Sequence, residues 1–184
     1  MEGHQVVRDM TIHIRNAGAR DRDAIRDVTL AAYEEYAAVV PEPFWIAYRR
    51  RLLETLDDDG PAERIVAERQ GAIVGSVLLF PSDANAYGRS APGGECPEVR
   101  LLAVRPDARG QGVGLALMEE CMHRARRAGA QALGLHTMDF MVTAVRMYTR
   151  MGFVRMPPLD FSPAPGVLVK GYRLDLMTPP AIAR

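Results

Sequence analysis

Apolar and polar positions along the chain follow two periods, one of two residues and one of three to four. The first is typical of half-buried strands and the second of amphipathic helices. Together they predict a mixed α/β fold in the order β-α-α-β-β-β-α-β-α-β-β. The predicted strands span 11–15, 64–68, 72–80, 99–104, 132–137, 153–156 and 167–176, and the predicted helices span 21–39, 44–56, 115–129 and 140–151.

Residues between these elements refine the prediction. Asp21 and Asp139 stand where helix N-caps are expected. Gly75, inside a strand pattern, indicates a bulge or a close approach of another backbone. The segment 81–97 is rich in Gly, Pro and Ser, and it is a candidate lid or an ornament of the fold. The proline-rich segment 157–165 is predicted to be a second loop.

The length and the absence of repeats indicate one domain. The chain has 184 residues, of which 48% are apolar and 25% charged. These proportions are ordinary for globular proteins. We expect a single domain over 11–176. Residues 1–10 and 177–184 are predicted to be a flexible leader and a flexible tail.

Charge and cysteine content narrow the function classes. The formal net charge is zero, which does not favour nucleic-acid binding. No apolar run is long enough to cross a membrane, and the first ten residues do not resemble a secretory signal. Cys96 and Cys121 form no disulfide framework, and no metal-ligand spacing is present. These features predict a cytoplasmic protein with reduced thiols.

The central chemical signal is the turn Arg109-Gly110-Gln111-Gly112-Val113-Gly114, which joins a predicted strand to a predicted helix. The first helical turn exposes unpaired backbone N–H groups and the positive end of the helix dipole, and glycines leave those amides accessible. Such a turn favours a phosphate or pyrophosphate ligand. A P-loop is excluded because Lys170 is the only Lys, and the dinucleotide pattern fails at Leu115 or Leu117.

Two signatures in the right order resemble those of the GNAT superfamily of N-acetyltransferases. Arg109-x-x-Gly112-x-Gly114 is similar to its acyl-CoA motif, and Ala144-x-x-Met147-Tyr148-x-x-x-Gly152-Phe153 to its second motif. The resemblance implies one domain with a mostly antiparallel twisted sheet of about seven strands and about four helices. It also implies transfer of an acetyl group from acetyl-CoA to a primary amine of a small molecule or peptide by direct attack. Another acyl-CoA donor, or a non-catalytic acyl-CoA sensor or scaffold, is the alternative.

The resemblance assigns the cofactor to one strand and the turn that follows it. The turn amides would hold the pyrophosphate, Arg109 would add a charge-assisted contact, and the strand edge would pair with the pantetheine arm. The implied cofactor-binding residues are Leu102, Ala103, Val104, Arg109, Gly110, Gln111, Gly112, Val113 and Gly114. Met141 replaces an Asn that is frequent in the family, so one polar contact to the cofactor arm is absent or replaced.

Three residues are candidates for proton transfer. Glu98 heads the key strand, where many members of the family have a general base, and His136 is the rival because neutral imidazole is a competent base near pH 7. The resemblance places Tyr148 beside the CoA sulfur, as a proton donor to the leaving thiolate.

The acceptor site is the least determined part of the sequence. The two helices at 21–39 and 44–56 would form one wall of the acceptor cleft. The predicted substrate-binding residues are Tyr33, Tyr36, Trp45 and His136, with Phe44 and the acidic pair Glu34–Glu35 nearby. The aromatic residues are equally compatible with core packing, and the acidic pair is more typical of a solvated face. Pairing of the last strand between subunits would make a homodimer.

Overall fold

The structure, a computed structural model, describes residues 11–82 and 96–177. The predicted leader, most of the tail and most of the candidate lid therefore lie outside the described residues. The elements alternate much as the periodicity predicts. In chain order they are β1 His13–Asn16, α1 Arg22–Tyr33, α2 Glu42–Asp57, β2 Glu63–Arg69, β3 Ala72–Phe80, β4 Glu98–Val104, α3 Val113–Arg127, β5 Ala132–Thr137, α4 Val142–Arg150, β6 Val154–Arg155, β7 Phe161–Ala164 and β8 Val167–Asp175.

The strands of the described residues form one sheet in the order β1-β2-β3-β4-β5-β8-β6, and β7 pairs with β8. All neighbours are antiparallel except β4 and β5. These two strands pair only at Glu98↔Gly134 and Val99↔Leu135, and then diverge. The sheet is thus open in its middle, beside the second half of β4.

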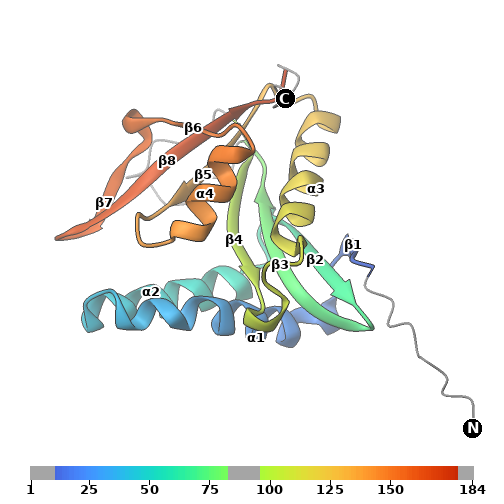
Figure 1. Cartoon of the computed structure of the whole chain (residues 1–184), viewed down its shortest axis with the longest axis horizontal. Coiled ribbons are helices and arrows are strands. Elements are labelled where there is room, and N and C mark those ends of the chain that lie inside the picture. The colour runs from blue at the N-terminus through green and yellow to red at the C-terminus, as the bar shows by residue number, and fades with distance from the viewer. Residues whose placement is uncertain (1–10, 83–95, 178–184) are drawn as a thin grey trace, which may run out of the picture.

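Helices cover both faces of the sheet (Figure 1). Along β3, Val77 and Leu79 pack with α3 and α4, whereas Leu78 and Phe80 pack with residues of α1 and α2. This alternation follows from the two-residue period of a strand. Each side of the sheet therefore has its own apolar core.

Gly75 shows both features that the sequence left open. The register of β2 and β3 shifts between Ala67 and Glu68, opposite Gly75. A Cβ atom on Gly75 would lie 2.7 Å from a methyl group of Val113 and 3.0 Å from one of Leu117. The absence of a side chain at Gly75 therefore lets α3 pack closely against the sheet.

The first helix is shorter than predicted. Its α-helical part ends at Tyr33, and the chain continues as a 3₁₀ helix over Glu34–Ala38. The predicted cap at Asp21 was wrong in its chemistry. The Asp21 carboxylate accepts hydrogen bonds from the Gly18 amide and from Arg15, and makes no side-chain bond to the helix amides.

Asp139 also has a role other than capping. Met141 is the N-cap of α4, whereas the Asp139 carboxylate pairs with Lys170 of β8 at 2.6 Å. The cation on the neighbouring strand competes for the carboxylate, so the Asp139 side chain joins two elements instead of ending one.

The proline-rich segment 157–165 is not simply a loop. It contains a 3₁₀ helix, Pro157–Leu159, and the strand β7. Phe161 pairs with Val169 and Ala164 with Val167, and Pro163 lies within the shifted register between them. Proline is tolerated in such irregular edge strands, which is why composition hides this strand.

The homodimer that pairing of the last strand would make stays a prediction. One edge of β8 pairs with β5 over its second half, and the strand also pairs with β6 and β7. Much of β8 is therefore already paired within this chain.

Within 11–82 and 96–177, no helix combines the length and the apolar character that crossing a membrane requires.

Candidate active site

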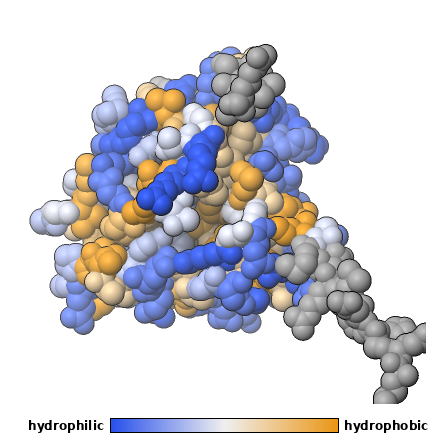
Figure 2. Space-filling view, in the orientation of Figure 1, coloured by the Kyte–Doolittle hydropathy of each residue, from blue (hydrophilic) through white to orange (hydrophobic). Residues whose placement is uncertain are grey.

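One large cavity, about 1290 Å³, lies where the sheet opens. Its walls come from α1 and the following 3₁₀ helix, α2, β4, the turn before α3, the end of β5, α4 and β7. Figure 2 shows the surface hollowed there, with apolar residues on the floor of the hollow and polar residues on its rim. The glycine-rich turn and the aromatic residues of α1, its 3₁₀ extension and α2 all line this cavity.

The turn has an open, glycine-dependent backbone. Gly110 and Gly112 have φ angles of 71° and 83°. Both values lie in the left-handed region that favours glycine. Gly112 is the N-cap of α3, and no side chain caps this helix. A Cβ atom at either glycine would meet no other atom within 4 Å. The first turn of α3 therefore presents its amides and its positive dipole end to an open space that fits an anion.

A bulge distorts β4 beside this turn. The register with β3 shifts between Ser76 and Leu78, and Leu101 has a φ of 50°. Such a positive angle is unusual for a residue with a side chain. Leu101, Leu102 and Val104 line the cavity. Because β4 and β5 have already separated here, the edge of β4 on the side of β5 faces the cavity, while the other edge pairs with β3.

Glu98 and His136 form a hydrogen-bonded pair. The Nδ1 atom of His136 lies 3.1 Å from Oε1 of Glu98, and its Nε2 atom lies 2.9 Å from the carbonyl oxygen of Leu159. The parallel register Glu98↔Gly134 brings both side chains to the same face of the sheet. His136 lines the cavity, and Glu98 joins it through this bond.

Both ring nitrogens of His136 therefore have a partner. A carbonyl oxygen only accepts, so Nε2 of His136 donates to Leu159. The other nitrogen, Nδ1, faces the Glu98 carboxyl group. The two contacts fix the orientation of the imidazole ring beside Glu98.

Tyr148 lies in α4 and lines the cavity. Its side chain is buried, and its ring packs at 5.8 Å from that of Phe153. Burial raises the pKa of the Tyr148 phenol above its ordinary value of 10. The phenol therefore stays protonated at neutral pH and can donate.

Cys121 is not a candidate nucleophile. It is fully buried in the core beneath α3, and burial raises the pKa of its thiol to about 12. The thiolate that a nucleophile needs is therefore not formed at neutral pH.

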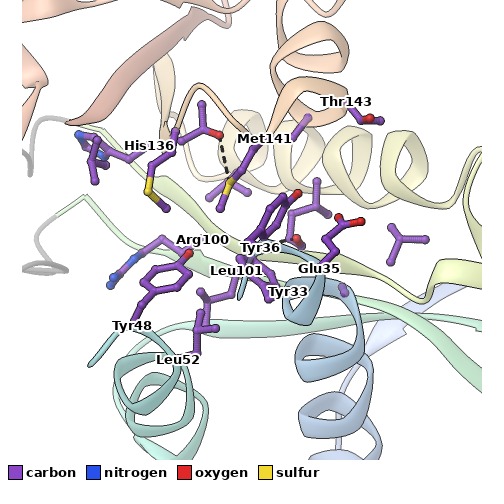
Figure 3. A pocket seen from close by; sticks show the side chains of 18 of the residues that line it. Tyr33, Glu35, Tyr36, Tyr48, Leu52, Arg100, Leu101, His136, Met141 and Thr143 are labelled. Carbon is purple, nitrogen blue, oxygen red and sulfur yellow. Dashed lines mark hydrogen bonds between the residues drawn. The ribbon is translucent and has the colours of Figure 1, made fainter. Parts of the chain in front are cut away.

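Tyrosine rings gather in the wall of the cavity that α1, its 3₁₀ extension and α2 form. The rings of Phe44 and Tyr48 stack at 5.6 Å, and Tyr33 lies 5.9 Å from Tyr36 and 6.1 Å from Tyr48. Figure 3 shows Tyr33, Tyr36 and Tyr48 projecting from the helices towards Arg100 and His136 on the sheet. Burial and the neighbouring Glu35 raise the pKa of Tyr36 to about 12, and burial raises that of Tyr48 further, so both phenols stay neutral.

Arg109 does not point along the turn. Its guanidinium donates to the Glu35 carboxylate at 2.8 Å and to the Ala32 carbonyl oxygen at 3.0 Å. Arg109 thus ties the turn to the wall formed by α1 and its 3₁₀ extension. Its expected charge-assisted contact with a phosphate stays a prediction.

Comparison with known proteins places these features in a family. Residues 24–153, well over half of the chain, match the model of the Acetyltransferase (GNAT) family. The chain belongs to this family.

Curated relatives of this GNAT protein carry several names. It is 35% identical to the mycothiol acetyltransferase of Cellulomonas flavigena over 58% of its own length and 32% of that protein. It is 32% identical to the IAA acetyltransferase of Azospirillum brasilense over 55% of its own length and 61% of that protein. The chain thus spans between about a third and three fifths of the length of these relatives.

Solved structures share the GNAT fold at low identity. The PaiA N-acetyltransferase of Thermoplasma acidophilum, in complex with coenzyme A, has a TM-score of 0.65 and 15% identity, and covers 88% of this chain and 98% of its own. A GNAT-family acetyltransferase of Desulfovibrio desulfuricans has a TM-score of 0.66 and 20% identity, and covers 90% of this chain and 99% of its own.

Sequence reasoning on the GNAT acceptor wall was partly wrong. Tyr33, Tyr36 and His136 line the cavity as expected, but Trp45 is 8% exposed and packs in the core with Val28 and Leu52. Tyr48, one helical turn after Trp45, lines the cavity where Trp45 was expected. Periodicity finds the aromatic stripe of α2 but not which side of it faces the opening.

Two further lining residues were missed. Arg100 follows Glu98 by two residues and therefore shares its face of β4. Phe161 of β7 lies edge-on to His136, with ring centroids 5.4 Å apart. The alternation of residues along β4 could have predicted that Arg100 lies beside Glu98. Phe161 could not be predicted, because the strand β7 that carries it was not recognised in the sequence.

Proposed function

We propose that this chain is an acetyl-CoA-dependent N-acetyltransferase that acts on a primary amine of a small molecule or peptide. The observation that carries the proposal is the cavity itself. It is lined by the open glycine turn at the start of α3, by Tyr148, and by His136, which is hydrogen-bonded to Glu98. Anion binding, proton acceptance and proton donation are the three capacities that acetyl transfer from a thioester to an amine requires.

The described residues fit acetyl-CoA. The turn amides and the left-handed Gly110 and Gly112 suit a pyrophosphate, and the edge of β4 at Leu102 and Val104, which line the cavity, suits an extended, amide-containing arm. One structural neighbour was solved with its cofactor acetyl-CoA and another with coenzyme A. When bound, acetyl-CoA supplies an acetyl group activated as a thioester.

The Glu98–His136 pair answers the protonation problem of the acceptor. An alkyl amine has a pKa near ~10.4, so its neutral form costs about 4–5 kcal/mol at pH 7. In our proposal Glu98 is the general base, reaching the amine through water. His136 is hydrogen-bonded to Glu98 and to the carbonyl oxygen of Leu159, so it positions the carboxyl group.

Tyr148 is the proposed proton donor to the leaving sulfur. It lines the cavity from α4, on an element different from the one that carries Glu98. Its raised pKa keeps the proton on the phenol at neutral pH. The proposed acid and base thus belong to separate elements, α4 and β4.

Release of free thiol from acetyl-CoA in the presence of mixed primary amines tests this function. We expect the native chain to release thiol and Glu98→Gln to lower the rate at least about 100-fold, because Gln cannot accept the proton. Glu120→Gln is the matched control, since Glu120 lies on α3 and pairs with Arg124.

Two outcomes would count against the proposal. If acetyl-CoA binds but no amine gives thiol release, the chain is a non-catalytic acyl-CoA-binding protein. If Glu98→Gln and Glu120→Gln have the same small effect, the chain has another base.

A further inference from the structure

The aromatic residues that line the cavity indicate what kind of acceptor it binds, which membership of the family does not specify. If the turn before α3 binds the phosphates, the part left for the acceptor lies between α1, α2 and β7. Its helical wall carries the rings of Tyr33, Tyr36, Phe44 and Tyr48, and Phe161 lines it from β7. The four helical rings contact one another in a chain, whereas Phe161 packs against His136.

The rings of this wall already contact one another in the two arrangements that aromatic groups prefer. Phe44 and Tyr48 are nearly parallel, with 12° between their planes, whereas Tyr33 and Tyr36 meet edge to face at 77°. Tyr36 also packs against Phe140, with centroids 5.2 Å apart. Stacked and edge-to-face contacts of this kind are what an additional aromatic ring makes with its neighbours.

The charges of the cavity disfavour a polycation. Among the described residues, the charged side chains of the lining are Arg51, Arg100, Arg109 and Arg150 against Glu35 and Glu54. Glu35 is bound to Arg109 at 2.8 Å, and Glu54 lies 3.5 Å from Arg50. Both carboxylates therefore already face a cation, and the excess of arginine repels multiple ammonium groups.

The neutral rings also help the reaction itself. The phenols of Tyr36 and Tyr48 keep their protons at neutral pH, so this wall presents little charge. An apolar surrounding disfavours the ammonium form of an amine and lowers its pKa. An acceptor whose body is aromatic thus gains contact area and reaches its reactive neutral form more easily.

We infer that the acceptor is an arylalkylamine, that is, a primary amine on a short chain that carries an aromatic ring. This inference rests on the proposed acetyl transfer. The amine nitrogen bonds to the acetyl carbon as the carbon–sulfur bond breaks. In the proposed mechanism one amine proton passes through water to Glu98, and the sulfur takes a proton from Tyr148. The products are the N-acetylated amine and free CoA thiol.

The test compares kcat/KM for four amines with acetyl-CoA: 2-phenylethylamine, ethylamine, spermidine and glucosamine. Ethylamine has the same reacting group without the ring, so the ratio of the first two values measures ring recognition. We expect 2-phenylethylamine to exceed ethylamine about 10- to 100-fold, the discrimination that burial of one apolar group gives. Spermidine, which a cation–π or acidic site would favour, is expected to be no better than ethylamine.

Variants on α2 assign the preference to the wall. Phe44→Ala should lower the ratio of 2-phenylethylamine to ethylamine at least about fivefold, because it removes one of the stacked rings. Ile46→Ala is the control, since Ile46 is an apolar residue on the same helix that is 62% exposed. The fluorescence of Trp45, the single Trp of the chain, supplies a binding readout independent of turnover, because its ring lies 6.2 Å from that of Tyr48.

The outcomes separate the two proposals. Equal or better use of spermidine, glucosamine or ethylamine would overturn the inference and leave acetyl transfer intact. Loss of the ratio in Ile46→Ala as well as in Phe44→Ala would also overturn it. No thiol release with any amine would remove both proposals.

Discussion

Tyr148 is the residue whose assignment depends most on a single atom, its phenolic oxygen. Tyr148→Phe removes this atom and keeps the ring packed against Phe153. We expect kcat to fall about 10- to 100-fold, because the departing thiolate loses its proton donor. Acetyl-CoA affinity, measured by titration calorimetry, should stay the same.

A matched variant checks that assignment. Tyr172→Phe removes a phenol from a buried ring on β8, where Arg155 stacks over the ring at 5.5 Å. It should keep the native kcat. An unchanged kcat in Tyr148→Phe would remove the proposed role of the phenol.

Asp21 lies away from the cavity, and its ion pair with Arg15 makes an electrostatic contribution to the free energy of unfolding that can be measured. Its hydrogen bonds to Arg15 lower the pKa of its carboxyl group from 3.8 to about 2. A lowered folded-state pKa stabilises the fold above the unfolded pKa, and this stabilisation is lost as the pH falls from about 4 towards 2. The Arg15 side chain is 36% exposed and therefore screened by solvent. We accordingly expect a contribution of about 1 kcal/mol.

Urea unfolding of Asp21→Asn measures this contribution. At pH 7 the variant should unfold with about 1 kcal/mol less free energy than the native chain, and the difference should shrink at pH 3. Arg26 is the reference, because its ion pair with Asp57 is exposed on both sides, and Arg26→Gln should change stability little. A difference for Asp21→Asn that is the same at both pH values would exclude the ion pair as its cause.

At the scale of elements, two glycines at the start of α3 separate the effect of the backbone conformation from the effect of the space around a side chain. Gly112 has a φ of 83°. Gly112→Ala therefore forces a side chain into the left-handed region, which costs about 1–2 kcal/mol. Gly114 lies within the helix, and a Cβ there would meet Met147 and Val104 at 3.5 and 3.6 Å, an ordinary contact distance. The two glycines of this signature therefore differ. Gly112 is favoured by its backbone angle, whereas Gly114 has an ordinary backbone angle and room for a Cβ atom.

Thermal unfolding with and without acetyl-CoA separates these two glycines. Gly112→Ala should lower acetyl-CoA affinity at least about tenfold, because relief of the strain moves the amides of the turn. Gly114→Ala should keep the ligand-induced shift and be as stable as the native chain or slightly more so. If both variants lose the shift equally, access to the amides, and not the backbone conformation, controls binding.

The elements also show what the sequence can and cannot specify. Strands β3 and β5 have the predicted bounds, because the apolar runs of 72–80 and 132–137 are bordered by turn residues. Strand β7 was missed, since it contains Pro163, is followed by Pro165, and depends on β8 for its pairing. The local sequence pattern predicts an element correctly when the element has an apolar face of its own. The prediction fails when the element forms only through pairing with a neighbouring strand.

At the scale of the whole molecule, the site exists because the sheet brings distant segments together. Glu98 and His136 were considered as rival bases, and the structure joins them through the parallel register of β4 and β5. Likewise, Arg109 and Glu35 connect the turn of one half to the wall of the other. Motif reasoning finds each residue singly, but pairing, and the exclusion of Trp45 from the cavity, depend on tertiary packing.

The central claim is that the turn before α3 binds acetyl-CoA, and thermal unfolding tests it most directly. We would compare acetyl-CoA, free CoA and NAD, each at about a hundred times the expected dissociation constant. Such a ligand stabilises by about 2.7 kcal/mol, which raises Tm by several degrees in a domain of this size. The account predicts a shift with both CoA species and none with NAD; no shift with either CoA species, or an equal shift with NAD, would contradict it.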